Sequence, residues 1–310
     1  MGVKNTNMKS VGIVLVNWNG YEHTIKCIRS LKQVTYPNVH IILVDNGSEL
    51  KEVEALRKIN GIELIVNPKN LGFTGGNNVG IKCAYESGHD FIMMLNNDTT
   101  VEPDFLEHLV AAFDETTGAV QPKISSMHDT DILWNAGGDF NPWMGLPTTI
   151  GEGSQDGPEF SKARNLGWIT GCALLFNRSM VEVVGYLDDD FFILFEDVNW
   201  SLRCIDAGYQ LKYIPASRIY HFESATAIAR TKGKEGFRSP FRQYINIRNH
   251  LFFIRKNLAP RYLFTAYTYQ VIKISKYLLY YILRQRWQKF NFTLRGVRHG
   301  LGPFRKIDFK

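Results

Sequence analysis

Short apolar runs alternate with helix-like segments through the first third of the chain. Four runs, Val11–Val16, Val39–Val44, Ile62–Val66 and Asp90–Leu95, are mostly unbroken, which is typical of strands buried on both faces of a parallel sheet. The segments between them carry apolar side chains at helical spacing or many charges, and they predict crossover helices. We therefore expect an α/β fold built on a parallel sheet.

Three of these strands end in small polar residues. Asn17 and Asn19 follow the first strand, Asp45 follows the second, and Asn96 and Asp98 follow the fourth. Ligands of open α/β sheets bind outside the carboxyl ends of the strands, so this edge is the expected binding site. Each polar turn alone could equally be structural, because Asn and Asp favour turns.

Each side chain at this edge could bind a ligand or could have only a structural role. Asp98 and Asn96 offer two oxygens that could hold Mg²⁺ or Mn²⁺ against a phosphate. Asp45 could accept a hydrogen bond from a nucleobase or ribose hydroxyl, or could only cap a helix. The Gly72–Gly76 segment, expected as a loop before a helix that ends near Ser87, could admit a phosphate or could be a flexible connection. Neither a Walker A motif nor the dinucleotide fingerprint is present.

The second candidate site lies where an apolar, aromatic run meets a predicted helix. Glu196 and Asp197 stand at this point. Asp197 could simply interact with the helix dipole. A carboxylate held beside apolar surface can instead have a raised pKa and act as a general base. His221, at the end of a later strand, could be a packed histidine or could share a metal ion with Asp98.

Composition limits the fold size and the classes of partner that we expect. With 310 residues, 45% of them hydrophobic, the chain can form one large α/β domain or two smaller ones. The net charge of +6 favours anionic partners, but no nucleic-acid recognition motif is present. The four cysteines lack metal or redox spacing, and the N-terminus lacks a signal-peptide core. We therefore expect reduced cysteines and a cytoplasmic location.

The region 134–156 and the C-terminal third have a different character. Gly, Pro and Trp in 134–156 predict long loops over the ligand edge. The basic stretch Ala229–Ser239 predicts a mobile loop, which could close over an anionic ligand or could only be solvated. Helices are expected over Phe241–Leu258 and Tyr262–Leu283.

The last of these helices reaches transmembrane length. Lys273 and Lys276 stand at its centre and argue against a span. A basic, aromatic, amphipathic helix fits the membrane interface better, so we expect peripheral membrane contact. Packing on the rest of the chain or in a homo-oligomer would use the same face.

Taken in order, the motifs resemble the family-2 inverting glycosyltransferases of the GT-A fold, in the group that includes rhamnosyltransferases. The resemblance covers about residues 10 to 225 and rests on Val16–Asn19, Val44–Ser48, Asn70–Asn78, Leu95–Thr99, Thr170–Ala173, Phe195–Arg203, Gly208–Tyr209 and His221. It implies a Rossmann-like, mixed, mainly parallel sheet flanked by helices. The implied catalytic domain is 1–225, with a nucleotide-sugar half (about 10–125) and an acceptor half (about 126–225). A C-terminal helical extension over 226–310 follows.

The resemblance also implies an activity. The donor would be a nucleotide sugar, dTDP-rhamnose or a UDP-hexose, and the acceptor a glycan or lipid-linked hydroxyl in cell-surface polysaccharide synthesis at the inner face of the membrane. Asp197 would be the general base beside Glu196, and Asp98 with His221 would hold Mn²⁺ or Mg²⁺ on the pyrophosphate. The remaining implied donor contacts are Asn17, Asn19, Asp45, Asn70, Gly72, Asn77, Asn96 and Gly171.

Two positions depart from the family pattern. Asn96 replaces the first carboxylate of the Asp-x-Asp metal motif, and Asn199 stands where an Asp often follows the catalytic Asp. The missing carboxylate leaves a non-catalytic nucleotide- or glycan-binding relative as the alternative. A nucleotidyltransferase is disfavoured because Asn17–Gly20 lacks the basic residues which that chemistry uses.

Overall fold

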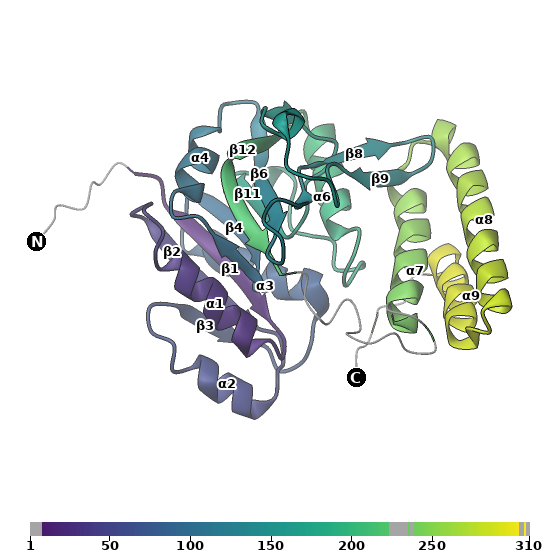
Figure 1. The fold of residues 1–310 in the computed structure, drawn as a ribbon, viewed down its shortest axis with the longest axis horizontal. Helices are drawn as coiled ribbons and strands as arrows, with labels where there is room; N and C mark the ends of the chain where they lie inside the picture. The colour runs from purple at the N-terminus through teal and green to yellow at the C-terminus, as the bar shows by residue number, and fades with distance from the viewer. Residues whose placement is uncertain (1–7, 223–234, 236–238, 304–306, 308–310) are drawn as a thin grey trace, which may run out of the picture.

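The computed structural model describes residues 8–222, 235, 239–303 and 307. A ten-stranded sheet forms the centre, helices cover both of its faces, and three long helices stand together at one end (Figure 1). The expected mobile loop over Ala229–Ser239 lies almost entirely outside the described residues.

The first half of the chain builds the parallel part of the sheet, in strand order β4-β1-β2-β3. The alternation of strand and helix predicted from the apolar runs is confirmed. In chain order the elements are β1 (Val11–Asn17), α1 (Tyr21–Leu31), β2 (Val39–Asp45), α2 (Leu50–Leu56), β3 (Glu63–Val66), α3 (Gly72–Glu86) and β4 (Phe91–Asn96).

The second half extends the sheet from β4 in the order β11-β6-β12-β10. Because β11 runs antiparallel to both β4 and β6, the sheet is mixed, as expected for the GT-A fold. The elements are β5 (Thr99–Val101), α4 (Phe105–Ala111), β6 (Thr117–Ser126), β7 (Leu133–Asn135), β8 (Gly138–Asn141), β9 (Leu146–Thr149), a 3-10 turn (Pro158–Phe160), β10 (Arg164–Asn165), β11 (Ala173–Asn177), α5 (Met180–Val183), α6 (Glu196–Asp206) and β12 (Gln210–His221).

The expectation of long loops over 134–156 is wrong in part. This region forms a β8–β9 hairpin that extends toward the C-terminal helices (Figure 1). At its turn, the carbonyl of Gly145 accepts a hydrogen bond from His250 Nε2 (2.6 Å), and Trp143 packs edge-on against Tyr262. Apolar and hydrogen-bonded contacts to distant helices therefore order a segment whose local composition predicts loops.

The glycine-rich segment is helical rather than a loop. Helix α3 begins at Gly72, which has a φ of 79°, and includes Gly76 and Gly80. A Cβ at Gly80 would lie 2.2 Å from Val14, and one at Gly76 would lie 2.8 Å from Val16. These glycines let the helix approach β1 closely, which offsets their low helix propensity.

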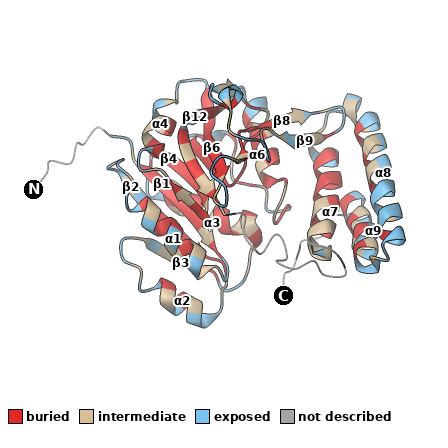
Figure 2. Cartoon of the chain, in the orientation of Figure 1, coloured by how far each residue is buried: buried red, intermediate tan, exposed pale blue. Residues whose placement is uncertain are grey.

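Alternate residues of β1 face two separate apolar cores. Ile13 packs with Ile28 of α1 on one face, and Val14 packs with Ile81 of α3 on the other. This is the period-2 alternation of a strand covered on both sides, and Figure 2 shows the central strands almost wholly buried. The buried strands hold their carboxyl ends in fixed positions.

The chain ends in three helices, α7 (Pro240–Asn257), α8 (Pro260–Leu283) and α9 (Trp287–Leu301). Ser239 caps α7 by accepting a hydrogen bond from the Arg242 N–H (3.1 Å). Helix α7 is the most buried of the three, whereas the outer face of α8 is exposed (Figure 2). None of the helices in the described part of the chain is long and apolar enough to cross a membrane.

Candidate active site

The carboxyl ends of β1, β2 and β4 lie side by side, as the sequence predicts. Asn17 is the register partner of Asp45, and Val16 is the partner of Asn96. Asp45 is fully buried and accepts a hydrogen bond from Asn17 Nδ2 through Oδ1 (2.9 Å). One edge of the sheet thus carries the polar groups of three loops.

Asn17 connects several of these loops. Its Nδ2 also donates to Glu52 Oε1 (2.7 Å), and its Oδ1 accepts from the Thr24 hydroxyl (2.8 Å). Glu52 Oε1 accepts a second hydrogen bond from the Gly20 N–H (2.7 Å). Glu52 is a site residue that sequence reasoning missed, because a glutamate on a short charged helix has the pattern of a solvated residue.

Asn46 is a second missed residue, and it organises the start of α3. Its Nδ2 donates to Asn70 Oδ1 (3.1 Å) and to the Gly72 carbonyl (2.8 Å), and its Oδ1 accepts from the Leu71 N–H (3.1 Å). Asn70 Oδ1 accepts a further bond from the Gly72 N–H (2.7 Å). Its place directly after Asp45 was the available sequence signal.

Two other predicted donor contacts have local partners. Asn19, with a φ of 49°, accepts a hydrogen bond from the Glu49 N–H (3.0 Å) and so joins the first two loops. Asn77 lies inside α3, where its buried amide donates to the Phe73 carbonyl (2.9 Å). Asn77 is therefore engaged with its own helix.

Asp98 and His221 meet although they are far apart in sequence. His221 Nε2 lies 3.1 Å from Asp98 Oδ1 and 3.5 Å from Asn96 Nδ2. Asn97, between the two strand-end residues, points the other way and donates to Thr24 Oγ1 (2.8 Å). Burial alone would lower the pKa of His221, but Cys172 and Asp98 beside it raise that pKa to about 10.

This group of side chains fits a hard divalent cation. It offers a carboxylate from Asp98 and an imidazole from His221, both donors used for Mn²⁺ or Mg²⁺. Asn96 lies beside them with its Nδ2 toward His221, so its amide oxygen would reach a cation only after the amide turns over. His221 Nδ1 is buried without a hydrogen-bond partner in the described structure. No cluster of three or more His, Cys, Asp or Glu side chains suited to a metal occurs among the described residues, so ligand phosphates would have to complete the coordination.

Asp197 is fixed at the beginning of α6 by two backbone N–H groups. Its Oδ2 accepts from Gly171 (3.0 Å), and its Oδ1 accepts from Val198 (2.8 Å). Desolvation raises the pKa of Asp197, and these two hydrogen bonds offset part of the rise. A carboxylate with this environment can accept a proton.

Glu196 is buried beside Asp197. It is 4% exposed, and its Oε2 has no hydrogen-bond partner within the described part of the chain. Burial and the charge of Asp197 raise the pKa of Glu196 well above its usual value. A buried acid of this kind favours the protonated form, which distinguishes it from Asp197.

The loop before α6 is strained. Three of the five non-glycine residues with positive φ in the described structure lie here: Phe192 (66°), Leu194 (71°) and Phe195 (74°). Left-handed backbone costs an ordinary L-residue about 1–2 kcal/mol. Sequence reasoning missed this conformation, because Phe and Leu do not favour it locally, and strain of this kind is often found at functional sites.

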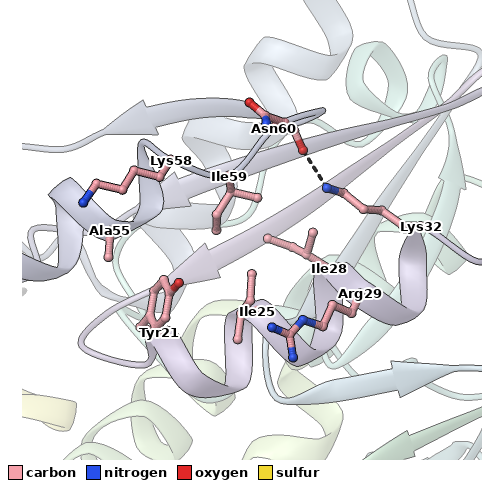
Figure 3. A pocket seen from close by; sticks show the side chains of 9 residues that line it. All are labelled: Tyr21, Ile25, Ile28, Arg29, Lys32, Ala55, Lys58, Ile59 and Asn60. Carbon is pink, nitrogen blue, oxygen red and sulfur yellow. Dashed lines mark hydrogen bonds between the residues drawn. The ribbon is translucent and has the colours of Figure 1, made fainter.

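A separate groove opens between α1 and α2 (Figure 3). Aliphatic side chains and the cations Arg29, Lys32 and Lys58 line it, and Lys32 Nζ donates to the Asn60 carbonyl (2.7 Å). None of the candidate site residues borders this groove. The candidate active site is therefore defined by the strand ends and not by this hollow.

The chain is similar to known proteins of one enzyme family. Residues 12–185 match the profile of Glycosyl transferase family 2, which is more than half of the chain. The chain belongs to this family and is a glycosyltransferase. The matched stretch contains Asp45 and Asp98 and ends before Glu196 and Asp197.

Two curated relatives have related names. The dTDP-rhamnosyl transferase RfbF of Shigella flexneri is 22% identical over 241 residues, covering 77% of this chain and 79% of the relative. The N-acetylglucosaminyl-diphospho-decaprenol L-rhamnosyltransferase of Mycobacterium tuberculosis is 26% identical over 239 residues, covering 68% of this chain and 76% of the relative.

Two solved structures share the fold. GalNAc-T7, crystallised with UDP, GalNAc and Mn²⁺, superposes with a TM-score of 0.57 at 20% identity, covering 69% of this chain and 44% of its own. The mannosyltransferase PcManGT from Pyrobaculum calidifontis, in complex with GDP-Man and Mn²⁺, gives 0.55 at 14% identity, covering 96% and 88%. The fold is GT-A.

Proposed function

We propose that this protein is an inverting glycosyltransferase that moves a sugar from a nucleotide sugar to an acceptor hydroxyl. The observation that carries the proposal is a pair of hydrogen bonds donated by backbone N–H groups. Asn96 N–H donates to the Cys172 carbonyl (2.8 Å), and the preceding Gly171 N–H donates to Asp197 Oδ2 (3.0 Å). A proposed base is thereby tied to the strand end that carries Asp98.

The donor would lie along the sheet edge. Asp45, held by Asn17, would face the nucleoside, and Asp98 with Asn96 and His221 would hold the divalent cation at the pyrophosphate. The cation would neutralise the charge that develops on the leaving nucleoside diphosphate. Mn²⁺ is supported by the ion bound to both structural neighbours.

The acceptor side would use Asp197. Its carboxylate takes the proton of the acceptor hydroxyl while that oxygen bonds to the anomeric carbon. The bond from this carbon to the diphosphate oxygen breaks on the opposite face, and the nucleoside diphosphate leaves. One displacement inverts the configuration, and no covalent intermediate on the enzyme is required.

The relatives favour particular substrates. Both names contain a rhamnosyl transfer and one contains dTDP, which supports dTDP-rhamnose as the donor. UDP-hexoses are the second choice. The decaprenyl diphosphate in one of these names supports a lipid-linked glycan as the acceptor, which is consistent with polysaccharide synthesis at the inner face of the membrane. The replacement of a metal carboxylate by Asn96 favours, as a second candidate, a relative that binds nucleotide without transfer.

The C-terminal helices supply a surface for such an acceptor. Large exposed apolar side chains follow one face of α8, including Phe264 (81% exposed), Leu279 (59%) and Leu283 (72%). Residues 236–307 contain fifteen Lys and Arg and no Asp or Glu. Apolar side chains beside an excess of positive charge suit an anionic bilayer surface, and a second copy of the chain is the competing occupant.

The experiment is nucleotide release from dTDP-rhamnose, UDP-glucose, UDP-galactose and UDP-N-acetylglucosamine, each with Mn²⁺ or EDTA. Metal-dependent turnover of one donor, increased by a lipid-linked acceptor, would support the transferase and identify the sugar. Binding of a donor without turnover, even with membrane extract as the source of acceptor, would favour the non-catalytic relative.

A further inference from the structure

The strained loop before α6 is held from one side by helix α7. The side-chain amide of Asn249 lies 2.8 Å from each of three carbonyl oxygens, those of Phe191, Ile193 and Leu194. Asn249 is fully buried, so water does not compete for these carbonyls. Its N–H groups therefore satisfy the carbonyls of Ile193 and Leu194 in the strained loop, and the Phe191 carbonyl accepts from the Ile193 N–H (2.8 Å) as well.

Arg248 fixes the orientation of that amide. Its Nη1 donates to Asn249 Oδ1 (2.6 Å) and to the Asp190 carbonyl (2.9 Å). A guanidinium has only donors, so the amide oxygen of Asn249 must face Arg248 and the amide nitrogen must face the loop. The charged donor also strengthens the contact in this buried position.

Two turns further along α7, other side chains contact the segment before α6 and α6 itself. Lys256 pairs with Asp188, and Asn257 Oδ1 accepts from Asn199 Nδ2 (2.7 Å), one turn into α6. Residues 249 and 256 are seven positions apart, about two turns, which places them on the same side of the helix, with 248 and 257 flanking them. Helix α7 therefore holds both the loop and the helix that carries Asp197.

On its other side, the loop before α6 contacts the start of helix α3, which lies at the proposed donor-binding edge. The Thr74 N–H of α3 donates to the Phe192 carbonyl (3.0 Å), and a Cβ at Gly72 would lie 2.5 Å from that residue. The loop is thus clamped between the start of α3 and helix α7, with Asp197 directly after it. A shift of the loop would move the carboxylate relative to the donor edge.

We propose that Asn249, oriented by Arg248, is a positioning residue that keeps Asp197 in register with the donor-binding edge. The C-terminal helices are then part of the catalytic unit and not only an attachment surface. This inference rests on the proposed role of Asp197. It is independent of which sugar is transferred.

The test compares Asn249→Asp with Asn246→Asp, a change of the same chemistry on a half-buried residue of the same helix. Asn249→Asp replaces the donors that face three carbonyls by oxygen. We expect kcat to fall at least about tenfold while the Kd for the nucleoside diphosphate stays within about threefold. Amide hydrogen exchange over 191–198 should accelerate about tenfold or more. Asn246→Asp should leave all three quantities unchanged.

Asn249→Ala is the second variant, because it removes the donors without adding charge and should change kcat and exchange in the same direction. Equal kcat in the 249 and 246 variants would overturn the inference, as would faster exchange with an unchanged kcat, which would make the contact merely structural. If the wild type transfers no sugar from any donor, the proposed function fails and the positioning role fails with it. A working wild type with insensitive Asn249 variants overturns the positioning role alone.

Discussion

Gly171 donates its backbone N–H to Asp197 Oδ2 at 3.0 Å, and this bond joins the start of α6 to the segment that leads into β11. Gly171 precedes β11, which pairs with β4, the strand that carries Asn96 and leads to Asp98. The bond also stabilises the ionised form of Asp197 against desolvation. The proposed base is therefore positioned and kept basic by the same contact.

The buried acid beside it gives a prediction about stability and pH. The pKa of Glu196 is raised in the folded state, so folding favours its protonated form and this stabilisation is lost as the pH rises through the folded pKa. Glu196→Gln removes the cost of a buried charge at high pH. We expect the variant to be more stable than the wild type by about 1–3 kcal/mol at pH 8, with the gain vanishing near pH 4.

Thermal or urea unfolding at several pH values measures this difference. Glu182→Gln, at an exposed residue of the short helix α5, is the control, and it should show no pH-dependent gain. A gain from Glu196→Gln that is constant from pH 4 to pH 8 would contradict the assignment of a raised pKa.

The proposed metal site predicts opposite effects for two substitutions. Asp98→Asn removes the charged ligand and should weaken Mn²⁺ binding in the presence of nucleoside diphosphate by about tenfold or more. Asn96→Asp restores a second carboxylate and should tighten that binding by about threefold to tenfold, since ligand charge controls affinity for hard cations. Calorimetric titration of Mn²⁺ measures both effects without depending on turnover.

Asn97→Asp is the matched control, because its side chain turns back to Thr24 and away from His221. It should leave Mn²⁺ affinity unchanged. If Asn97→Asp raises the Mn²⁺ affinity as much as Asn96→Asp does, the cause is the added negative charge and not coordination of the ion. The assignment of Asn96 as a ligand is then wrong.

The exposed face of α8 predicts binding to anionic bilayers. Vesicles of phosphatidylcholine with about 30% phosphatidylglycerol should bind the protein, and high salt should weaken the binding. The double substitution Leu279→Glu and Leu283→Glu should reduce the fraction bound by about tenfold or more, because it replaces apolar contact by repulsion. Sedimentation with vesicles measures this fraction.

Leu50→Glu is the control for this experiment, because Leu50 is 74% exposed on α2, outside the C-terminal helices. It should bind vesicles as the wild type does. The wild type could instead fail to bind the vesicles and form a dimer that the double substitution dissociates. That result would assign the α8 face to a second copy of the chain.

The sequence predicted the donor edge well. Unbroken apolar runs identify strands covered on both faces, and parallel strands must bring their polar ends to one edge, so Asn17, Asp45 and Asn96 could be placed together without coordinates. The contact of His221 with Asp98 was one of two alternatives from the residue types, and the family resemblance favoured it. No local pattern specifies which of two distant strand ends will meet.

Long-range packing determined what the sequence did not reveal. Glycines normally disfavour a helix, so the start of α3 at Gly72 is visible only once the close approach of Gly80 to Val14 is known. The left-handed Phe192 and Leu194 contradict local preference. Hydrogen bonds from Thr74 to the Phe192 carbonyl and from Asn249 to the Leu194 carbonyl compensate for it. Compensation between segments that are far apart in the chain produces no periodic pattern in the sequence.

The central claim is that Asp197 takes the proton of the acceptor. The most direct measurement is the rate of sugar transfer by Asp197→Asn under single-turnover conditions, with Asp206→Asn at the exposed end of the same helix as control. We predict a rate lower by about a thousandfold or more, an unchanged Kd for the donor nucleotide, and normal transfer by the control. Transfer by Asp197→Asn within about tenfold of the wild-type rate would contradict the account.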